Sequence, residues 1–316
     1  MNYTNTGNKE TRAGFGTGLL EAGRNNLNVV ALTADLNGSV KTDAFAAEFP
    51  DRFINTGIAE ANMINVAAGL ALSGKIPFAG SFAVFATGRV YDQIRQSVAY
   101  SNTNVKICGS HAGLTLGEDG ATHQIMEDFA LMKALPNMVV LCPCDYNQTK
   151  AATIAAAKYT GPVYIRYGRP SVPNFTSETD ALEIGKAQKL VDGTDVTIFA
   201  TGHLVWEALL ACNELKQQGI SAEVINIHTI KPLDAKAIIE SALKTGAVVS
   251  AEEHFRNGGL GESIAQVLIT NTKTPMEIVA VDDKFGQSGK PMELLAEYQL
   301  THPYIVDAAK KAISRK

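Results

Sequence analysis

Short apolar runs alternate with stretches of helical periodicity along the first half of the chain. Runs of mainly β-branched and aliphatic residues predict strands at 28–33, 76–82, 105–109, 138–142 and 162–167. The stretches between them predict helices at 10–26, 57–73, 86–101, 124–135 and 146–159. This alternation is typical of a parallel sheet with helices packed on its faces.

The second half of the chain repeats the alternation on a smaller scale. It predicts strands at 196–200, 222–227, 247–251 and 277–281, and helices at 204–218, 233–244, 259–271 and 291–297. Prolines, serines and threonines break the rhythm over 170–190. We therefore expect an α/β fold of two doubly wound units, with residues 1–178 as the first unit, 179–190 as a linker and 191–316 as the second.

Length and composition are those of an ordinary globular protein. The 316 residues can form two domains that each bury a core. A net charge of −4 without a dense Lys/Arg stripe argues against nucleic-acid binding. No apolar stretch is long enough to span a bilayer, and the polar N-terminus lacks the apolar core of a signal peptide. We expect a cytoplasmic protein with no membrane contact.

Several motifs have a plain structural interpretation. Cys142 and Cys144 have no accompanying pair of Cys or His ligands, so we interpret them as strand-end residues and expect no metal ligand in this chain. The glycines at 14–18 and 258–261 do not complete a nucleotide-binding pattern. His254 is interpreted as an ordinary loop histidine rather than a residue that faces the junction between the units.

The segment GSHAGLTLGEDGATHQ at 109–124 is the most informative stretch of the chain. It contains two imidazoles and two carboxylates among four glycines, namely His111, Glu118, Asp119 and His123. We expect a loop, neither helix nor strand, that brings these groups to one place. A metal site is the alternative, but the spacing of the two histidines and Asp119 does not match a zinc pattern.

Glu60 lies near the start of the predicted helix 57–73. At helical spacing it shares a face with Ile64, Ala67 and Ala71. A carboxylate in line with an apolar stripe is partly removed from water and suits proton chemistry. The alternative is a first-turn glutamate that favours the helix dipole and faces solvent.

Phe82 and Phe85 directly follow the predicted strand 76–82. They can line a pocket at the carboxyl edge of the sheet, where α/β folds bind ligands, or they can be core aromatics.

Three donor-rich residues follow other elements of the first unit. Arg12 opens the first helix, Ser39 follows the first strand and Arg169 follows the last. They could converge on an anion at the same edge, although surface arginines are usually just solvated.

Taken in order, these segments resemble the C-terminal half of transketolase, and the resemblance covers essentially the whole chain. GEDGATHQ resembles the family segment GEDGPTHQ, and IAEANM resembles the helix that carries the cofactor glutamate. TADLNGS resembles the SADLxxS loop, and SFAVF resembles the TFxxF aromatics. The resemblance implies a thiamine-pyrimidine-binding domain, a smaller transketolase C-terminal domain and thiamine diphosphate as cofactor.

The resemblance also implies roles for individual residues. Glu60 would hydrogen-bond the pyrimidine and drive its amino–imino tautomerism, with Phe85 stacked on the ring and Phe82 beside it. Asp35 would lie close to the cofactor at a subunit interface. Asp119 and His123 would hold the donor sugar near its reacting carbons, and the sugar phosphate would be bound by Arg12, Ser39, His111 and Arg169.

Three positions depart from the family pattern. Gly88 stands where transketolases often have an aromatic residue, Ala112 replaces an aspartate, and Ala121 replaces a proline. These changes bear on substrate preference more than on the cofactor.

The sequence contains no G-D-G…N segment of the kind that holds the cofactor diphosphate through Mg²⁺ or Ca²⁺. The resemblance therefore implies one subunit of a split transketolase, whose N-terminal partner holds diphosphate and metal, in a heterotetramer of two plus two chains. The implied activity is the transfer of a two-carbon ketol unit between sugar phosphates, as in the pentose phosphate pathway. Alternatives are half of a deoxyxylulose-phosphate synthase, the β subunit of a 2-oxoacid dehydrogenase, or a non-catalytic regulatory partner.

Overall fold

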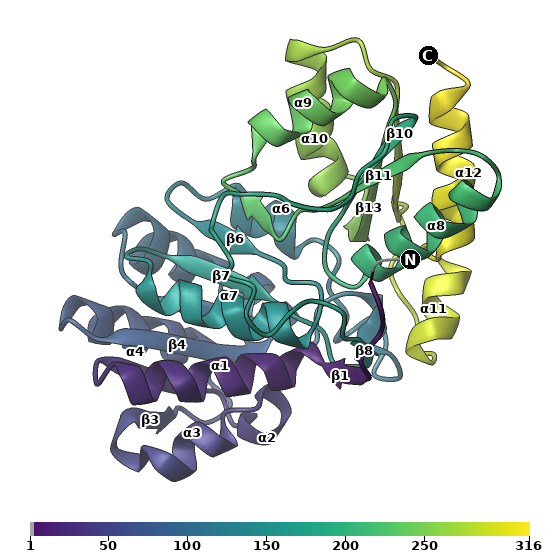
Figure 1. Cartoon of the computed structure of the whole chain (residues 1–316). Coiled ribbons are helices and arrows are strands. Elements are labelled where there is room, and N and C mark those ends of the chain that lie inside the picture. Colours follow the sequence, from purple (N-terminus) through teal and green to yellow (C-terminus); the bar gives the residue numbers. More distant parts are fainter. Residues whose placement is uncertain (1–2) are drawn as a thin grey trace.

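The computed structural model describes residues 3–316, so the first two residues of the expected first unit lie outside the described range. The first unit, in the lower part of Figure 1, is built on a seven-stranded sheet whose strand order is β12-β6-β7-β5-β4-β2-β3. Its strands are β2 (Val29–Thr33), β3 (Phe53–Asn55), β4 (Ile76–Phe82), β5 (Lys106–Ser110), β6 (Val139–Leu141), β7 (Val163–Arg166) and β12 (Thr229–Lys231). All are parallel except β12, which pairs antiparallel with β6.

Alternate residues of each strand pack on opposite faces of this sheet. Val29 and Ala31 belong to one hydrophobic cluster with Phe15 of α1, whereas Val30 and Leu32 belong to another that includes the apolar face of α4. The helices and helical turns of this part are α1 (Thr11–Asn25), α2 (Asn37–Val40), α3 (Asp43–Glu48), η1 (Pro50–Arg52), α4 (Glu60–Leu72), η2 (Val84–Gly88), α5 (Tyr91–Gln93), η3 (Ile94–Tyr100), η4 (Leu114–Leu116), α6 (Asp128–Lys133) and α7 (Tyr146–Lys158).

Two glycines bring α1 and α7 unusually close together. A Cβ on Gly14 would collide with the carbonyl oxygen of Tyr146, and one on Gly18 would lie 2.8 Å from that of Lys150. The GFGTG segment therefore serves helix packing. At the start of α1, β1 (Asn8–Glu10) pairs antiparallel with β8 (Ser171–Pro173).

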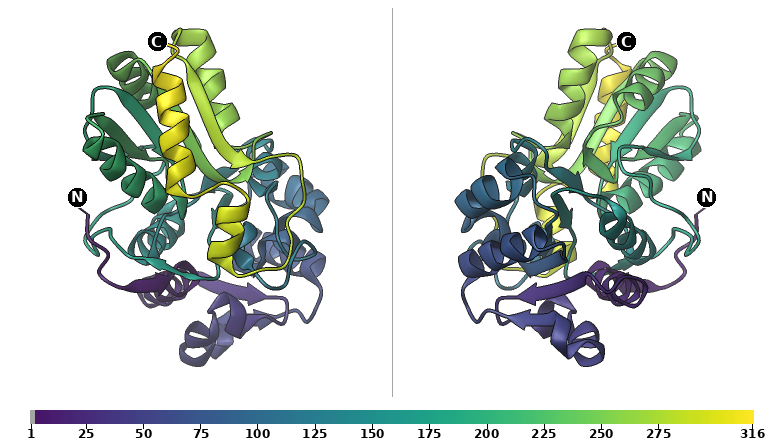
Figure 2. Two further views of the ribbon diagram at one scale, coloured as in Figure 1. Left: turned by 90° about the vertical axis from the view of Figure 1, so that its right-hand side faces the viewer. Right: turned by 90° about the vertical axis from the view of Figure 1, so that its left-hand side faces the viewer.

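The second unit contains a five-stranded sheet in the order β14-β13-β10-β11-β9. Its strands are β9 (Gln188–Val191), β10 (Val196–Ala200), β11 (Ala222–Asn226), β13 (Val248–Phe255) and β14 (Met276–Val281), with β9 antiparallel. Its helices are α8 (Leu204–Gln217), α9 (Ala235–Thr245), α10 (Leu260–Asn271), α11 (Pro291–Glu297) and α12 (His302–Ile313). Helices α8 and α12 cover one face and α9 and α10 the other, and both views of Figure 2 show this unit above the first.

The expected α/β fold with two parallel-sheet units is confirmed. The helix expected at 86–101 is wrong in detail, because the chain forms the π-helical turns η2 and η3 around the short α5. Strand β9 begins inside the range 179–190 expected as linker, and β12 joins the second half of the chain to the first sheet. The unit boundaries stay a prediction. Within residues 3–316, no helix is both long and apolar enough to cross a membrane.

Buried charges lie where the two units meet. Arg166 at the end of β7 makes two hydrogen bonds. Its Nε donates to the Asp128 carboxylate of α6 at 2.8 Å, and its Nη2 donates to the Glu253 carbonyl of β13 at 2.7 Å. Both partners of the ion pair are buried. His254 is also at this junction, with its ring stacked on Phe129 of α6 at 4.9 Å. The interpretation of His254 as a loop histidine is therefore wrong.

We expect His254 to make stability depend on acidity. Burial lowers the pKa of His254 from its ordinary 6.5 to about 4, so the folded protein binds its proton less readily than the unfolded chain. The stabilising contribution is complete above pH 6.5 and is lost as pH falls towards 4. His254→Phe keeps an aromatic ring on Phe129 but cannot titrate. Between pH 7.5 and pH 5 the free energy of unfolding should fall by about 2 kcal/mol less in this variant than in the unchanged protein. Urea denaturation at both pH values measures this, and equal losses would contradict it.

Candidate active site

The pairing of β4 with β5 brings the first two predicted site residues together. These strands are parallel, and Phe82 at the end of β4 is paired with Ser110 at the end of β5. The next residue, His111, has a left-handed backbone with φ of 58°. Its ring stacks on Phe82, with centroids 3.9 Å apart and planes inclined by 21°.

Phe82, Phe85 and His123 form an aromatic wall beside this stack. The rings of Phe82 and Phe85 are nearly parallel, with centroids 6.0 Å apart, and His123 meets the Phe85 ring edge-on at 5.4 Å. Both phenylalanines are only partly buried, which favours the pocket-lining interpretation over the core one. The loop after β5 thus returns to the residues that follow β4.

Glu60 lies at the first position of α4 and is only 4% exposed. Ile64 and Ala67 on the same helix face are fully buried, as the periodicity predicted. The carboxylate accepts hydrogen bonds from Arg89 Nη1 at 3.2 Å to Oε1 and 3.1 Å to Oε2. The Arg89 guanidinium also lies over the Phe85 ring, 4.2 Å from its centroid. Glu60 and Phe85 therefore face one small space.

The predicted anion-binding residues also converge. Arg12 Nη1 donates to the Ser39 carbonyl at 3.2 Å and lies 3.4 Å from His111 Nε2. A hollow of about 300 Å³ next to them is lined by Glu10, Arg12, Thr115, Leu116, Glu118, Arg169, Pro170, Ser171 and Pro291. Ser39 contributes its backbone carbonyl to Arg12 here, rather than its hydroxyl.

Carboxylates balance the arginines of this hollow. Glu10 forms ion pairs with Arg12 at 2.7 Å and with Lys41 at 3.1 Å, and Glu118 forms one with Arg169 at 3.1 Å. Partial burial on its own raises the pKa of Glu10, but the hydrogen bonds from Arg12 and Lys41 outweigh it and hold that pKa below its usual value. The hollow is thus polar and nearly neutral.

Two predicted residues lie apart from these groups. Asp35 is exposed, has a left-handed backbone with φ of 61° and accepts a hydrogen bond from Asn55 at 3.2 Å. Asp119 is half-exposed, and its carboxylate lies 4.0 Å from Arg169, whereas His123 belongs to the aromatic wall.

The second unit holds the loop 109–124 in place. Glu253 of β13 accepts a hydrogen bond from the Thr115 backbone N–H at 2.6 Å. Gly113 passes so close that a Cβ there would collide with the Glu253 carboxyl group, and its φ is +83°. Gln124 donates to the Leu114 and Gln287 carbonyls, both at 3.0 Å. Much of the loop is therefore buried, which its glycine-rich sequence did not indicate.

Sequence reasoning missed Arg89, Lys41 and Glu253. Arg89 follows Phe85 by four residues, a helical spacing that could have placed it on the same face. Lys41 follows Ser39 in the same short segment. Glu253 lies 138 residues from Thr115, and no local signal links the two.

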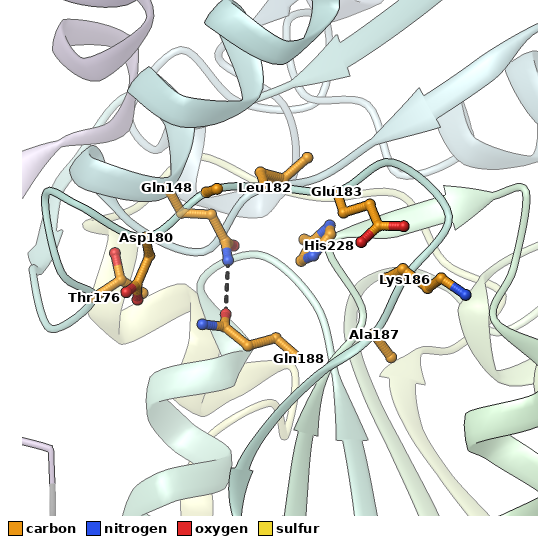
Figure 3. A pocket seen from close by; sticks show the side chains of 10 residues that line it. Gln148, Thr176, Asp180, Leu182, Glu183, Lys186, Ala187, Gln188 and His228 are labelled. Carbon is orange, nitrogen blue, oxygen red and sulfur yellow. Dashed lines mark hydrogen bonds between the residues drawn. The ribbon is translucent and has the colours of Figure 1, made fainter.

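A smaller hollow lies away from these residues, where the connecting segment passes Gln148 and His228 (Figure 3). A hydrogen bond between Gln148 and Gln188 crosses it at 3.0 Å. None of the predicted site residues lines it. We therefore place the candidate site at the aromatic wall and the neighbouring anion hollow.

Comparison with known proteins gives a match to a family model for each half of the chain. Residues 8–174 match the family model of the transketolase pyrimidine-binding domain, and residues 185–305 match that of the transketolase C-terminal domain. The chain belongs to the transketolase family. Membership of this family implies thiamine diphosphate as the cofactor.

Three relatives are similar over nearly their whole length. A Methanocaldococcus jannaschii protein described as a transketolase C-terminal section is 50% identical over 92% of both chains. A 6-deoxy-6-sulfo-D-fructose transketolase subunit of a Clostridium species is 47% identical, over 94% of this chain and 92% of that one. A solved split-gene transketolase, described as an inactive β4 tetramer, is 48% identical with a TM-score of 0.91, over 96% of this chain and 98% of that one.

The site residues fit the pyrimidine half of the transketolase cofactor. Phe85 is a partly exposed aromatic residue, and Glu60 offers a buried carboxylate that accepts hydrogen bonds from a half-exposed arginine. Among residues 3–316, no three His, Cys, Asp or Glu side chains gather in a metal-binding arrangement. His111 and His123 lie instead against the rings of Phe82 and Phe85.

We expect the His111 imidazole to be neutral at physiological pH. Burial, with Arg12 and Arg169 adding to it, lowers the pKa of His111 to about 3. Its ¹⁵N signals in histidine-labelled protein should not titrate between pH 5 and pH 8. Arg12→Met removes one nearby positive charge and should raise the pKa of His111. Lys236→Met, which removes an exposed cation from α9, is the control and should leave it unchanged. A His111 ring that titrates near pH 6.5 in the unchanged protein would contradict this assignment.

Proposed function

We propose that this chain is the C-terminal subunit of a two-chain transketolase, which reversibly transfers a two-carbon ketol unit from a ketose phosphate to an aldose phosphate. The observation that carries this proposal is the His111–Phe82 stack. It joins the wall that faces Glu60 to the hollow between Arg12 and Arg169. A cofactor site and an anion site are thus in direct contact.

Thiamine diphosphate, when bound, supplies a nucleophilic carbon and an electron sink for breaking the carbon–carbon bond. Glu60, whose carboxyl group is buried, would hydrogen-bond the pyrimidine nitrogen and hold a proton there. Phe85 covers one ring face, and Phe82 supports Phe85 and His111.

The remaining residues of the site bind and orient the substrate. His123 and Asp119 hold the hydroxyls of the donor sugar near the reacting carbons. The anionic end of the sugar is bound by Arg12, Ser39, His111 and Arg169, with His111 acting as a neutral hydrogen-bonding group. Asp35 is exposed, as a residue that contacts the cofactor from a subunit interface would be in a single chain.

A partner chain completes this site. The sequence has no G-D-G…N segment, and two relatives of similar length are described as a section and as a subunit of transketolases. We assign the diphosphate and its Mg²⁺ or Ca²⁺ to an N-terminal partner subunit, in an assembly of two plus two chains. These relatives favour a transketolase over a deoxyxylulose-phosphate synthase or a 2-oxoacid dehydrogenase. One of them acts on a sulfonated sugar, and the arginines of the hollow can bind either phosphate or sulfonate.

Glu60→Gln tests the catalytic assignment. The carboxamide has the shape of the carboxylate but cannot take up or release the proton, so ketol transfer by the chain reconstituted with its partner should fall by about 10²-fold or more. Assembly, measured by analytical ultracentrifugation, should persist. Glu240→Gln, at an exposed position of α9, is the control and should retain activity. Unchanged turnover in Glu60→Gln would favour the non-catalytic regulatory role.

The chain without its partner should neither transfer ketol units nor bind thiamine diphosphate tightly, because the diphosphate lacks its metal anchor. Addition of an N-terminal transketolase subunit that carries the G-D-G…N segment should restore both properties. Cofactor affinity by isothermal titration calorimetry and a coupled assay of aldose phosphate formation measure them. Substantial ketol transfer by the single chain would contradict the two-chain assignment.

A further inference from the structure

The Arg89 guanidinium occupies the space between Glu60 and Phe85. Its Nη1 donates to both carboxylate oxygens of Glu60, at 3.2 and 3.1 Å. Its central carbon lies 4.2 Å from the centroid of the Phe85 ring. One planar group thus satisfies the buried carboxylate and covers the aromatic face together.

An aminopyrimidine would use the same two partners. Its ring would stack on Phe85, and its nitrogens would hydrogen-bond the Glu60 carboxylate. A guanidinium also has a planar N–C–N group, donates to carboxylates and stacks on aromatic faces. The two groups are close chemical equivalents, so they cannot occupy the space together.

The local backbone holds Arg89 beside Glu60, but its side chain is free to move into solvent. Arg89 N donates a hydrogen bond to the Val84 carbonyl at 3.4 Å, which closes the π-helical turn η2 that contains Phe85. The neighbouring Gly88 has open space where a Cβ would be. The Arg89 side chain is 52% exposed, whereas that of Glu60 is 5% exposed. Arg89 can therefore swing into solvent without burying a charge, whereas Glu60 cannot leave.

We propose that Arg89 is an internal competitor for the pyrimidine site, which neutralises Glu60 when the site is empty and must be displaced when the cofactor binds. This inference rests on the proposed function, because it takes Glu60 and Phe85 as the pyrimidine site. Without Arg89, Glu60 would be a buried carboxylate that has lost its positive partner, a state that proteins avoid. The ion pair therefore keeps the empty site stable at the expense of cofactor affinity.

The expected size of the effect depends on how often Arg89 is paired with Glu60. When the pyrimidine site is free of Arg89 in only a fraction of the molecules, the apparent dissociation constant of the cofactor rises by the inverse of that fraction. If about nine molecules in ten have Arg89 on Glu60, its removal should tighten cofactor binding about tenfold.

Arg89→Met tests the inference in the assembled two-chain protein. Methionine retains an apolar stem beside Phe85 but neither pairs with Glu60 nor offers a planar cation. The dissociation constant of thiamine diphosphate with Mg²⁺, measured by isothermal titration calorimetry, should fall about tenfold. Arg89→Lys keeps a charge for Glu60 without the planar group and should give an intermediate value. Arg95→Met removes an exposed arginine of η3 and should leave the constant unchanged.

Unchanged or weaker cofactor binding in Arg89→Met would overturn the inference, provided that the variant unfolds at the same temperature as the unchanged protein. If the unfolding temperature of Arg89→Met falls, the test is made with Arg89→Lys. Tighter cofactor binding by Arg89→Lys than by the unchanged protein supports the competition, and equal or weaker binding overturns it. Failure of the proposed function is distinguishable, because Glu60→Gln would then retain its activity. If Glu60→Gln loses activity but Arg89→Met does not bind the cofactor more tightly, the proposal that Arg89 competes is overturned and the proposed function stands.

Discussion

The parallel pairing of β4 with β5 is the constraint on which the site depends. It places Phe82 opposite Ser110, so that the chain leaves both strands at the same edge and His111 meets the Phe82 ring. A shift of one residue would turn the Phe82 side chain to the other face of the sheet. The wall, the anion hollow and the loop that connects them would then separate.

The second unit keeps that edge in position through buried polar contacts rather than through apolar packing alone. The Arg166–Asp128 ion pair is buried and is completed by a hydrogen bond from Arg166 to the Glu253 carbonyl. The side chain of the same Glu253 accepts a hydrogen bond from the Thr115 backbone N–H in the loop. Removal of one member of such a pair leaves an uncompensated charge and typically costs about 3–5 kcal/mol. The position of the loop is thus coupled to the docking of the two units.

Periodicity predicted most of the fold, because parallel strands buried on both faces and the helices between them leave a strong pattern. It could not predict the π-helical turns η2 and η3, whose hydrogen bonds span five residues instead of four and which keep a similar apolar pattern. The antiparallel strands β9 and β12 were missed because they are short edge strands that pair with residues far away in the sequence.

The predictable parts of the site lie at the ends of neighbouring elements of the first sheet. These elements meet at one edge of the sheet, because the carboxyl ends of parallel strands lie together there. The local sequence is therefore enough to predict that His111, Phe82 and Arg12 come close to one another. Glu253 contributes through a contact between the two units, and its sequence neighbourhood carries no sign of that contact.

The charged groups of the anion hollow and of the space around Glu60 have counter-charges within the chain. Glu10 pairs with Arg12 and Lys41, Glu118 pairs with Arg169, and Glu60 pairs with Arg89. An anionic sugar that enters the hollow must compete with carboxylates, and a pyrimidine that approaches Glu60 must compete with a guanidinium. Such pairing keeps the empty site from holding uncompensated buried charge, and it makes binding depend on exchange of partners. A ligand that offers only charge gains little from this exchange. A pyrimidine that also stacks on Phe85, or an anionic sugar whose shape fits between Arg12 and Arg169, gains more, so the pairing favours shape as well as charge.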